Sequence, residues 1–189
     1  MVDLTKVTNF QRTLFELQEF WLVAICVAGK NGPKQAKKVH DFLDGQAGNT
    51  PFAKVRKMID GDKLLKRLKF VKMGQYNRIE RAFRESLDLD LEKCTLDDLT
   101  RIKGVGNKTS RFYLLHSRPD CEYVVLDTHI LRFLREICGL KNIPKSTPSN
   151  PEQYTAIERM AREAINDKFP NDTLADADLK IWLTMSGRV

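Results

Sequence analysis

The segment Leu99-Thr-Arg-Ile-Lys-Gly-Val-Gly-Asn-Lys-Thr-Ser110 carries most of the information about the fold. An apolar helical pattern ends at Ile102, Gly104 and Gly106 flank Val105, and a second helical pattern begins at Asn107. Glycine lets a backbone turn tightly and approach a partner without an intervening Cβ atom. The amides that open the second helix suit an anion. The segment therefore predicts two helices joined by a hairpin that binds an anion.

Val105 is expected to pin this hairpin to the core, and basic residues surround it. A plain turn between antiparallel helices is the alternative, because a Gly-x-Gly pattern alone is a weak signal. Such a hairpin binds a phosphate backbone without reading bases. The residues expected to contact the anionic partner are Lys103, Gly104, Val105, Gly106, Asn107, Thr109 and Arg111.

Lys108 and Asp127 are the candidate reactive residues. Lys108 lies on the first turn of the helix after the hairpin, and Asp127 follows the apolar run Tyr123-Val-Val-Leu126 and opens the next helix. An amine can act as a nucleophile, and a carboxylate at a helix start is held rigidly. Taken singly, each has another explanation: a solvated surface lysine and an ordinary N-cap. The sequence predicts that the two act together.

Helical periodicity runs through nearly the whole chain. The buried face expected for the first long helix repeats at steps of three and four residues, through Phe10, Leu14, Leu17, Trp21, Leu22, Ile25 and Cys26. Similar patterns separated by glycine and proline continue to Met185, and only the stretch 122–126 is β-like. The prediction is an all-α protein of about ten helices with short connections.

A connector rich in proline, serine and threonine, at residues 139–150, suggests that the last helices return onto the first one. We therefore expect two helical lobes with a cleft between them. One lobe spans residues 30–125 and contains the hairpin. The other combines residues 1–29 with residues 126–189.

The composition indicates a globular, basic protein. The 189 residues are 42% hydrophobic and 30% charged, with a formal net charge of +7. Such a surplus favours a polyanionic partner or an anionic membrane. No apolar run approaches the roughly 20 residues that span a bilayer, and no stretch of signal-peptide type begins the chain. We expect no membrane association and an intracellular monomer, cytoplasmic or nucleoid-associated.

Cysteine spacing predicts no metal site or disulfide framework. Cys26, Cys94, Cys121 and Cys138 form no Cys-x-x-Cys pair and no Cys/His pair at ligand spacing. Buried thiols are the simplest interpretation. We expect neither a metal nor another cofactor.

The hairpin Lys103-Gly-Val-Gly-Asn-Lys-Thr109, taken with Val125-Leu-Asp-Thr-His-Ile130, resembles the helix-hairpin-helix (HhH-GPD) DNA glycosylase superfamily, above all its endonuclease III branch. Looser similarity extends over residues 15–135. Met73-Gly-Gln-Tyr-Asn77 is similar to the family's glycine-and-tyrosine turn. The resemblance implies a two-lobed all-α fold, with the hairpin beside the cleft between the lobes.

The resemblance also implies a chemistry. The lysine at the position of Lys108 is the family's nucleophile, and the aspartate at Asp127 assists it. Cleavage of a sugar–base bond builds positive charge on the sugar, which a fixed carboxylate stabilises. Attack of the amine on C1′ leaves a Schiff base that permits β-elimination. The partner is duplex DNA with the target nucleotide flipped out of the stack. The expected activity is that of a DNA glycosylase with associated AP lyase activity.

Two departures from the family keep alternatives open. Endonuclease III relatives often carry a four-cysteine iron–sulfur loop, and no cysteine follows Cys138. The gap-filling glutamine usual at the end of the first long helix is also missing. Virus-encoded relatives that transfer an amino acid or similar group onto activated 5-hydroxymethyluracil in DNA are the second interpretation, with action in the host cytoplasm. A DNA-binding hairpin module without catalysis is the third, but it would need neither Lys108 nor Asp127.

A few further residues are candidates for the base pocket or for orienting the reactive groups. Lys30, Asn31 or Gln75 is a candidate to replace the missing glutamine. An ordinary helix stop is the alternative for Lys30 and Asn31. Tyr76 belongs to the same turn as Gln75, and His129 is expected to orient or pack rather than to bind a metal.

Overall fold

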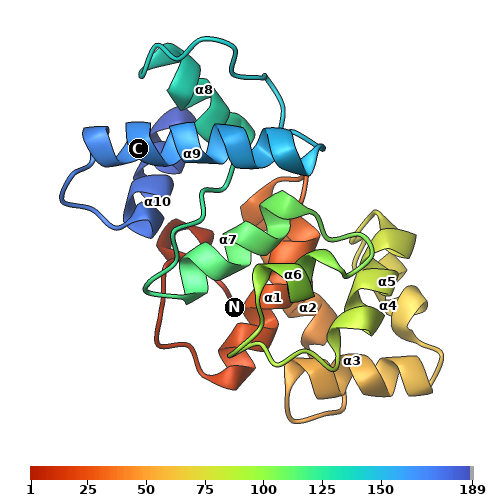
Figure 1. The fold of residues 1–189 in the computed structure, drawn as a ribbon. Helices are drawn as coiled ribbons and strands as arrows, with labels where there is room; N and C mark the ends of the chain where they lie inside the picture. The colour runs from red at the N-terminus through yellow and green to blue at the C-terminus, as the bar shows by residue number, and fades with distance from the viewer. Residues whose placement is uncertain (188–189) are drawn as a thin grey trace. The chain divides into compact units, whose positions relative to one another are not determined.

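The computed structural model describes residues 1–187, and every regular element among them is a helix. A short 3-10 helix, η1 (Leu4–Lys6), precedes ten α-helices. They are α1 (Leu14–Val27), α2 (Gly32–Leu43), α3 (Pro51–Asp60), α4 (Leu64–Phe70), α5 (Tyr76–Ser86), α6 (Leu96–Thr100), α7 (Asn107–Ser117), α8 (Thr128–Glu136), α9 (Pro151–Lys168) and α10 (Leu174–Met185). The all-α prediction is confirmed (Figure 1).

The helices begin where short polar side chains can cap them. Thr13 and Glu16 form a capping box, in which the Thr13 amide donates to Glu16 Oε2 at 2.8 Å. Thr95 and Asp98 form the same reciprocal arrangement at the start of α6. Asn31 and Asn150 cap α2 and α9, and each is followed by a proline in the first turn. These local signals account for most of the helix boundaries.

The structure divides into two compact units. The first contains residues 1–4 and 11–106, with α1 to α6, and the second contains residues 5–10 and 107–187, with α7 to α10. These boundaries differ from the expected lobes, because α1 packs against α2, α3 and α5 rather than joining the last helices. Only the short segment 5–10 belongs with the C-terminal helices.

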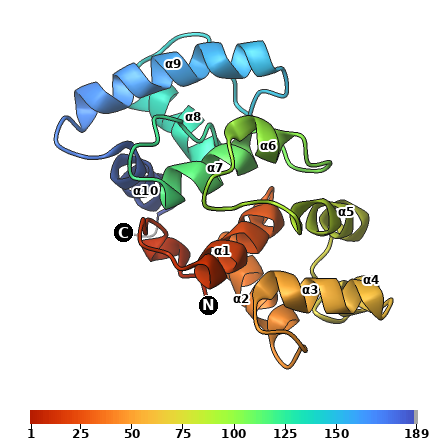
Figure 2. The ribbon, with the colours of Figure 1, turned by 60° about the horizontal axis from the view of Figure 1, so that its bottom comes forward.

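In the first unit, α1 is the central helix. Its residues from Leu17 to Cys26 are buried on every side, as is typical of a helix surrounded by others. The Trp21 indole donates a hydrogen bond to the Ser86 hydroxyl at 2.8 Å, which ties α1 to α5. Figure 2 shows α3 and α4 of this unit, which pack against each other and against α5.

The start of α1 differs from the expected one. The helix begins at Leu14, after the Thr13 cap, so Phe10 is not on its buried face. Phe10 packs instead in the second unit, in a small cluster with Leu115, Val125 and Ala175. Leu14 remains 45% exposed. The apolar pattern of the sequence continues on the N-terminal side of Thr13, but the Thr13 cap fixes the start of the helix.

In the second unit, α8, α9 and α10 share one apolar core that also takes in Val124 and Leu126. The β-like stretch 122–126 forms no strand. The amide of Val124 donates to Glu158 Oε1 at 2.8 Å, and the amide of Leu126 donates to the Tyr154 hydroxyl at 2.9 Å. Side chains of α9 therefore take the place of a neighbouring strand.

Candidate active site

The predicted hairpin forms as a tight turn after α6. Gly104 has φ +90°, a conformation that favours glycine. A Cβ atom there would lie 2.7 Å from Cγ of Arg78, whose guanidinium donates to the Gly104 carbonyl at 2.7 Å. Val105 is buried, as predicted, and its amide donates to the Ile102 carbonyl at 3.0 Å. Gly104 is thus required by its own conformation and by the side chain beside it.

The other hairpin residues differ from one another in exposure and in hydrogen bonding. The Lys103 side chain is exposed, but its backbone amide already donates to Glu85 Oε2 at 2.7 Å. A Cβ atom on Gly106 would meet nothing within 4 Å, so this glycine borders open space. Asn107 is the first residue of α7, where the sequence placed it. Lys103, Gly104 and Gly106 are therefore the exposed part of the predicted contact set, and Asn107 is half-buried.

Arg111 does not occupy the exposed position that its prediction as a DNA contact requires. It is only 4% exposed, and its guanidinium donates to both carboxylate oxygens of Glu158, at 2.8 and 2.9 Å. It also donates to Asn107 Oδ1 at 2.8 Å and lies 4.3 Å from the centre of the Tyr154 ring. Thr109 is buried as well. The Arg111 side chain therefore ties α7 to α9 within the second unit.

The Arg111–Glu158 pair gives a stability prediction. Glu158→Gln should lower the free energy of unfolding by roughly 3 kcal/mol, because it leaves a guanidinium buried without its counter-charge. Urea denaturation measures this change. Glu122→Gln is the matched control, since Glu122 pairs with Arg162 at 2.7 Å but is 79% exposed on its side chain. The control should change stability by less than about 1 kcal/mol, and equal effects of the two substitutions would contradict the assignment.

Lys108 lies on the first turn of α7, as predicted, and its side chain is half-buried. Within residues 1–187, no hydrogen bond or ion pair engages its ammonium group. A lysine in such a position lies close to the partial positive charge of a helix N-terminus, which is an unfavourable place for a cation. The ammonium group of Lys108 therefore has neither a hydrogen-bond partner nor a counter-charge among the described residues.

Asp127 is the N-cap of α8, and its carboxylate is held firmly. Oδ1 accepts from the backbone amides of His129 and Ile130, each at 2.8 Å. The side chain is half-buried. Two fixed donors on one oxygen orient the carboxylate and leave the second oxygen for another partner. The N-cap interpretation is confirmed, and it is compatible with a catalytic role.

Asp178, on α10, links the two candidate residues. Burial raises the pKa of its carboxyl, the hydrogen bond and charge of His116 lower it, the charge of Asp127 raises it and that of Lys108 lowers it. Lys108 and Asp127 therefore both lie close enough to Asp178 for their charges to act on it. All three residues belong to the second unit. The second unit thus places Lys108 and Asp127 within electrostatic range of the buried Asp178.

A chain of buried polar groups supports Asp178. His116 is fully buried, and its Nε2 lies 3.2 Å from Asp178 Oδ2, while its Nδ1 lies 3.0 Å from the Thr8 hydroxyl. The other oxygen of Asp178, Oδ1, is buried and has no hydrogen-bond partner among the described residues. Buried polar atoms in proteins are seldom without a hydrogen-bond partner, so an unpaired oxygen of this kind points to a functional role.

The raised pKa of Asp178 predicts a specific pH dependence. The folded protein keeps this proton at pH values where the unfolded chain has released it, so the free energy of unfolding should fall as pH rises above about 4. In Asp178→Asn this contribution is absent. The variant should gain stability relative to the unmodified protein as pH rises from about 4 to 6, below the usual titration range of histidine. Urea titrations at several pH values test this, and parallel profiles would contradict it.

The other predicted pocket residues are distributed between the two units. Lys30 donates to the Met73 carbonyl at 2.7 Å, and Gln75 accepts from Arg78 Nε at 2.7 Å, so both lie at the loop before α5 in the first unit. Tyr76 begins α5. Asn31 is the N-cap of α2, and its side chain accepts from the Lys34 amide. His129 is half-buried beside Asp127, in the second unit.

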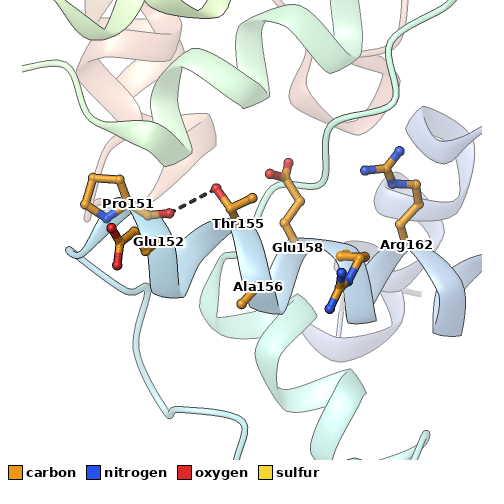
Figure 3. Close-up of a pocket in the computed structure, with 7 residues that line it drawn as sticks. Pro151, Glu152, Thr155, Ala156, Glu158 and Arg162 are labelled. Carbon is orange, nitrogen blue, oxygen red and sulfur yellow. Dashed lines mark hydrogen bonds between the residues drawn. The ribbon is translucent and has the colours of Figure 1, made fainter.

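A separate pocket lies along α9. It has a volume of about 570 Å³. Figure 3 shows the residues of α9 that line it, among them Glu158 and Arg162, with the Thr155 hydroxyl donating to the Pro151 carbonyl at 3.0 Å. The lining residues that the structure describes all come from α9. This pocket is therefore distinct from the Lys108 and Asp127 position.

The sequence interpretation missed Asp178 and His116. One signal was present: Asp178 lies at the same three- and four-residue steps as Ala175, Ile181 and Met185, which face the interior of α10. A carboxylate within a buried stripe is unusual and points to a special role. His116 had no comparable signal, because its partners Thr8 and Asp178 lie far away in the chain.

Two general properties complete the description of the site. Residues 1–187 contain no group of three or more His, Cys, Asp or Glu side chains that could hold a metal ion. No helix in the same part of the chain is both long enough and apolar enough to cross a membrane.

The fold is similar to that of a known enzyme structure. The 8-oxoguanine glycosylase/lyase of Methanocaldococcus jannaschii, solved in complex with a 15-mer DNA containing 8-oxoguanine, superposes with a TM-score of 0.67. The match is 21% identical and covers 97% of this chain and 87% of that one. No family model matches the sequence. The chain therefore has the all-α fold of helix-hairpin-helix DNA glycosylases.

Proposed function

We propose that this protein is a DNA glycosylase with associated lyase activity, in which Lys108 is the nucleophile and Asp127 the stabilising carboxylate. One observation carries the proposal. In a glycosylase-type fold, an unengaged lysine and a rigidly held aspartate both lie near the buried Asp178. A purely structural role for Lys108 does not explain why its ammonium has no partner among the described residues.

The positions of the two side chains suit the two halves of the reaction. As the bond between C1′ and the base breaks, its electron pair leaves with the base and positive charge develops on the sugar. The Asp127 carboxylate, held by two amides, stabilises that charge without reorganising. The neutral Lys108 amine donates its lone pair to C1′, forms the C–N bond and loses a proton to a nearby base.

The covalent adduct explains the lyase activity. Ring opening of the sugar converts the C1′–N bond into a protonated Schiff base, which acidifies the proton on C2′. Removal of that proton expels the 3′ phosphate by β-elimination, and water then releases Lys108. No step needs a metal or redox cofactor to balance its atoms and electrons.

DNA is expected to bind through its backbone. The exposed hairpin residues Lys103, Gly104 and Gly106 suit phosphate contacts, which position a protein without reading sequence. The net charge of +7 favours the same partner. The target nucleotide must leave the stack to reach Lys108. A cleft between the two units, with the hairpin beside it, remains a prediction.

Borohydride trapping tests the proposal. The protein is incubated with duplexes that contain uracil, an oxidised pyrimidine, 8-oxoguanine or an abasic site. 8-Oxoguanine is included because the structurally similar enzyme was solved with that lesion. We expect a covalent adduct with the abasic duplex and base release from at least one lesion.

A negative result has a defined meaning. If no adduct forms with any duplex and no base is released, the glycosylase proposal is wrong. Base transfer would then be the function to test, by mass spectrometry of nucleosides after incubation with hydroxymethyluracil-type DNA and amino acids. DNA binding without a product in either assay would identify a non-catalytic binding module.

A further inference from the structure

The loop before α5 has an unusual backbone and is held by side chains of α2 and of the residues just after α1. Three of its four residues, Lys72, Gly74 and Gln75, have φ between +48° and +73°. The Lys38 ammonium donates to the Lys72 carbonyl at 2.6 Å, and the Lys30 ammonium donates to the Met73 carbonyl at 2.7 Å. All of these residues belong to the first unit.

Lys30 lies directly against this loop. A Cβ atom on Gly74 would lie 2.4 Å from the Lys30 ammonium nitrogen, so a larger residue there would displace the end of the Lys30 side chain. Burial lowers the pKa of Lys30, and the charges of Lys38 and Arg78 lower it further. The charges of Lys30, Lys38 and Arg78 thus lie within range of one another, and Lys72 supplies the carbonyl that Lys38 contacts. We call Lys30, Lys38, Lys72 and Arg78 the loop cations.

The loop cations have no acidic counterpart. None of the four forms an ion pair within residues 1–187, and the hydrogen bonds of Arg78 go to the carbonyls of Gly104 and Ile25 and to the Gln75 amide oxygen. By contrast, Lys37 on the same α2 pairs with Asp41 at 3.0 Å. Nearby positive charges repel each other by about 1 kcal/mol or more at close range, so such a group reduces stability unless an anion joins it.

Each loop lysine retains donors for an anion. A lysine ammonium has three N–H groups, and the contacts to the loop carbonyls use one on Lys30 and one on Lys38. The Lys72 side chain is exposed. Carbonyl contacts hold the first two ammonium groups in place, which lowers the entropy lost when a phosphate binds.

We propose that the loop cations form a second phosphate-binding site, separate from the hairpin, for the sugar–phosphate backbone of bound DNA. The inference rests on the proposed function for the identity of the anion. Lys38 and Lys72 make the phosphate contacts, and Lys30 and Arg78 keep the loop in the conformation that exposes them.

The salt dependence of DNA binding tests this site. The dissociation constant of a fluorescein-labelled undamaged duplex is measured at several salt concentrations for the unmodified protein, Lys38→Met and Lys72→Met. Each phosphate contact that is lost should reduce the slope of log Kd against log salt by about one. The double variant should reduce it by about two.

Lys93→Met is the matched control. Lys93 is an exposed lysine of the same unit and lies 4.0 Å from Asp90. Its replacement by methionine removes one positive charge, as do Lys38→Met and Lys72→Met. The control should leave the slope unchanged. If all three single variants lower the slope equally, long-range charge explains the effect and the proposal is overturned; unchanged slopes in Lys38→Met and Lys72→Met overturn it as well. Lys38→Arg and Lys72→Arg should keep the original slope, and thermal unfolding verifies that each variant is folded.

The two proposals can fail separately. Trapping on an abasic duplex is measured with the unmodified protein, so it tests the glycosylase proposal without any change to the loop cations. If the unmodified protein forms no adduct but the salt slopes change as expected, the second phosphate site stands and the glycosylase proposal fails. If trapping succeeds and the slopes do not change, only the second phosphate site is wrong.

Discussion

Lys108→Gln is expected to abolish the borohydride-trapped adduct and to lower base release by about three orders of magnitude or more, as is usual when a covalent nucleophile is removed. Glutamine keeps a polar side chain that is one atom shorter, but its amide nitrogen cannot attack C1′. Since the ammonium of Lys108 has no partner among the described residues, the fold should lose nothing. Single-turnover assays with the preferred lesion and an abasic duplex measure both effects.

The control for this substitution is Lys168→Gln, at the exposed end of α9 in the same unit. It removes the same charge and should leave the adduct yield unchanged. Thermal unfolding should give the same midpoint for both variants within experimental error. An adduct that persists in Lys108→Gln would assign the nucleophile to another amine and would remove the basis of the proposed mechanism.

Asp127→Asn is expected to lower the rate of base release by about a hundredfold to a thousandfold, with little change in stability. Asparagine is as good an N-cap as aspartate, so the hydrogen bonds from the amides of His129 and Ile130 can be retained. What is lost is the negative charge that stabilises the developing positive charge of the sugar. The measurement is again the single-turnover rate, with DNA in excess of its dissociation constant.

A second substitution separates the charge from the cap. Asp127→Ala removes both and should lower the free energy of unfolding by about 1 kcal/mol in addition to the loss of rate. The two variants should therefore differ in stability but not in catalysis. A rate for Asp127→Asn close to that of the unmodified protein would show that Asp127 is only a cap.

Local signals predicted much of the architecture correctly. The turn after Ile102, the start of α7 at Asn107 and the cap at Asp127 lie where the sequence placed them. Each depends on residues within a few positions of one another: a glycine at positive φ, a short polar side chain before a helix, an apolar period. Interactions between residues that are close in sequence form whenever the helix forms, whatever the rest of the fold. Periodicity and capping preferences are therefore enough to predict them.

Boundaries between the units were not predictable in this way. The apolar period of α1 continues back to Phe10, yet Thr13 ends the helix and Phe10 packs in the other unit. A periodic apolar pattern indicates that one face of a helix is buried, but it does not indicate which element packs against that face. The partner is chosen by the packing of all helices together, and neither unit can be recognised before that packing is known.

Sequence alone thus determined the all-α class, the hairpin and the two candidate reactive residues, because short-range geometry and residue chemistry decide these features. Tertiary structure alone decided that Arg111 is paired with Glu158 instead of facing DNA, and that Asp178 and His116 lie buried beside the reactive residues. These pairs are 47 and 62 residues apart. Burial and charge compensation depend on which distant helices meet, and no local pattern encodes that choice.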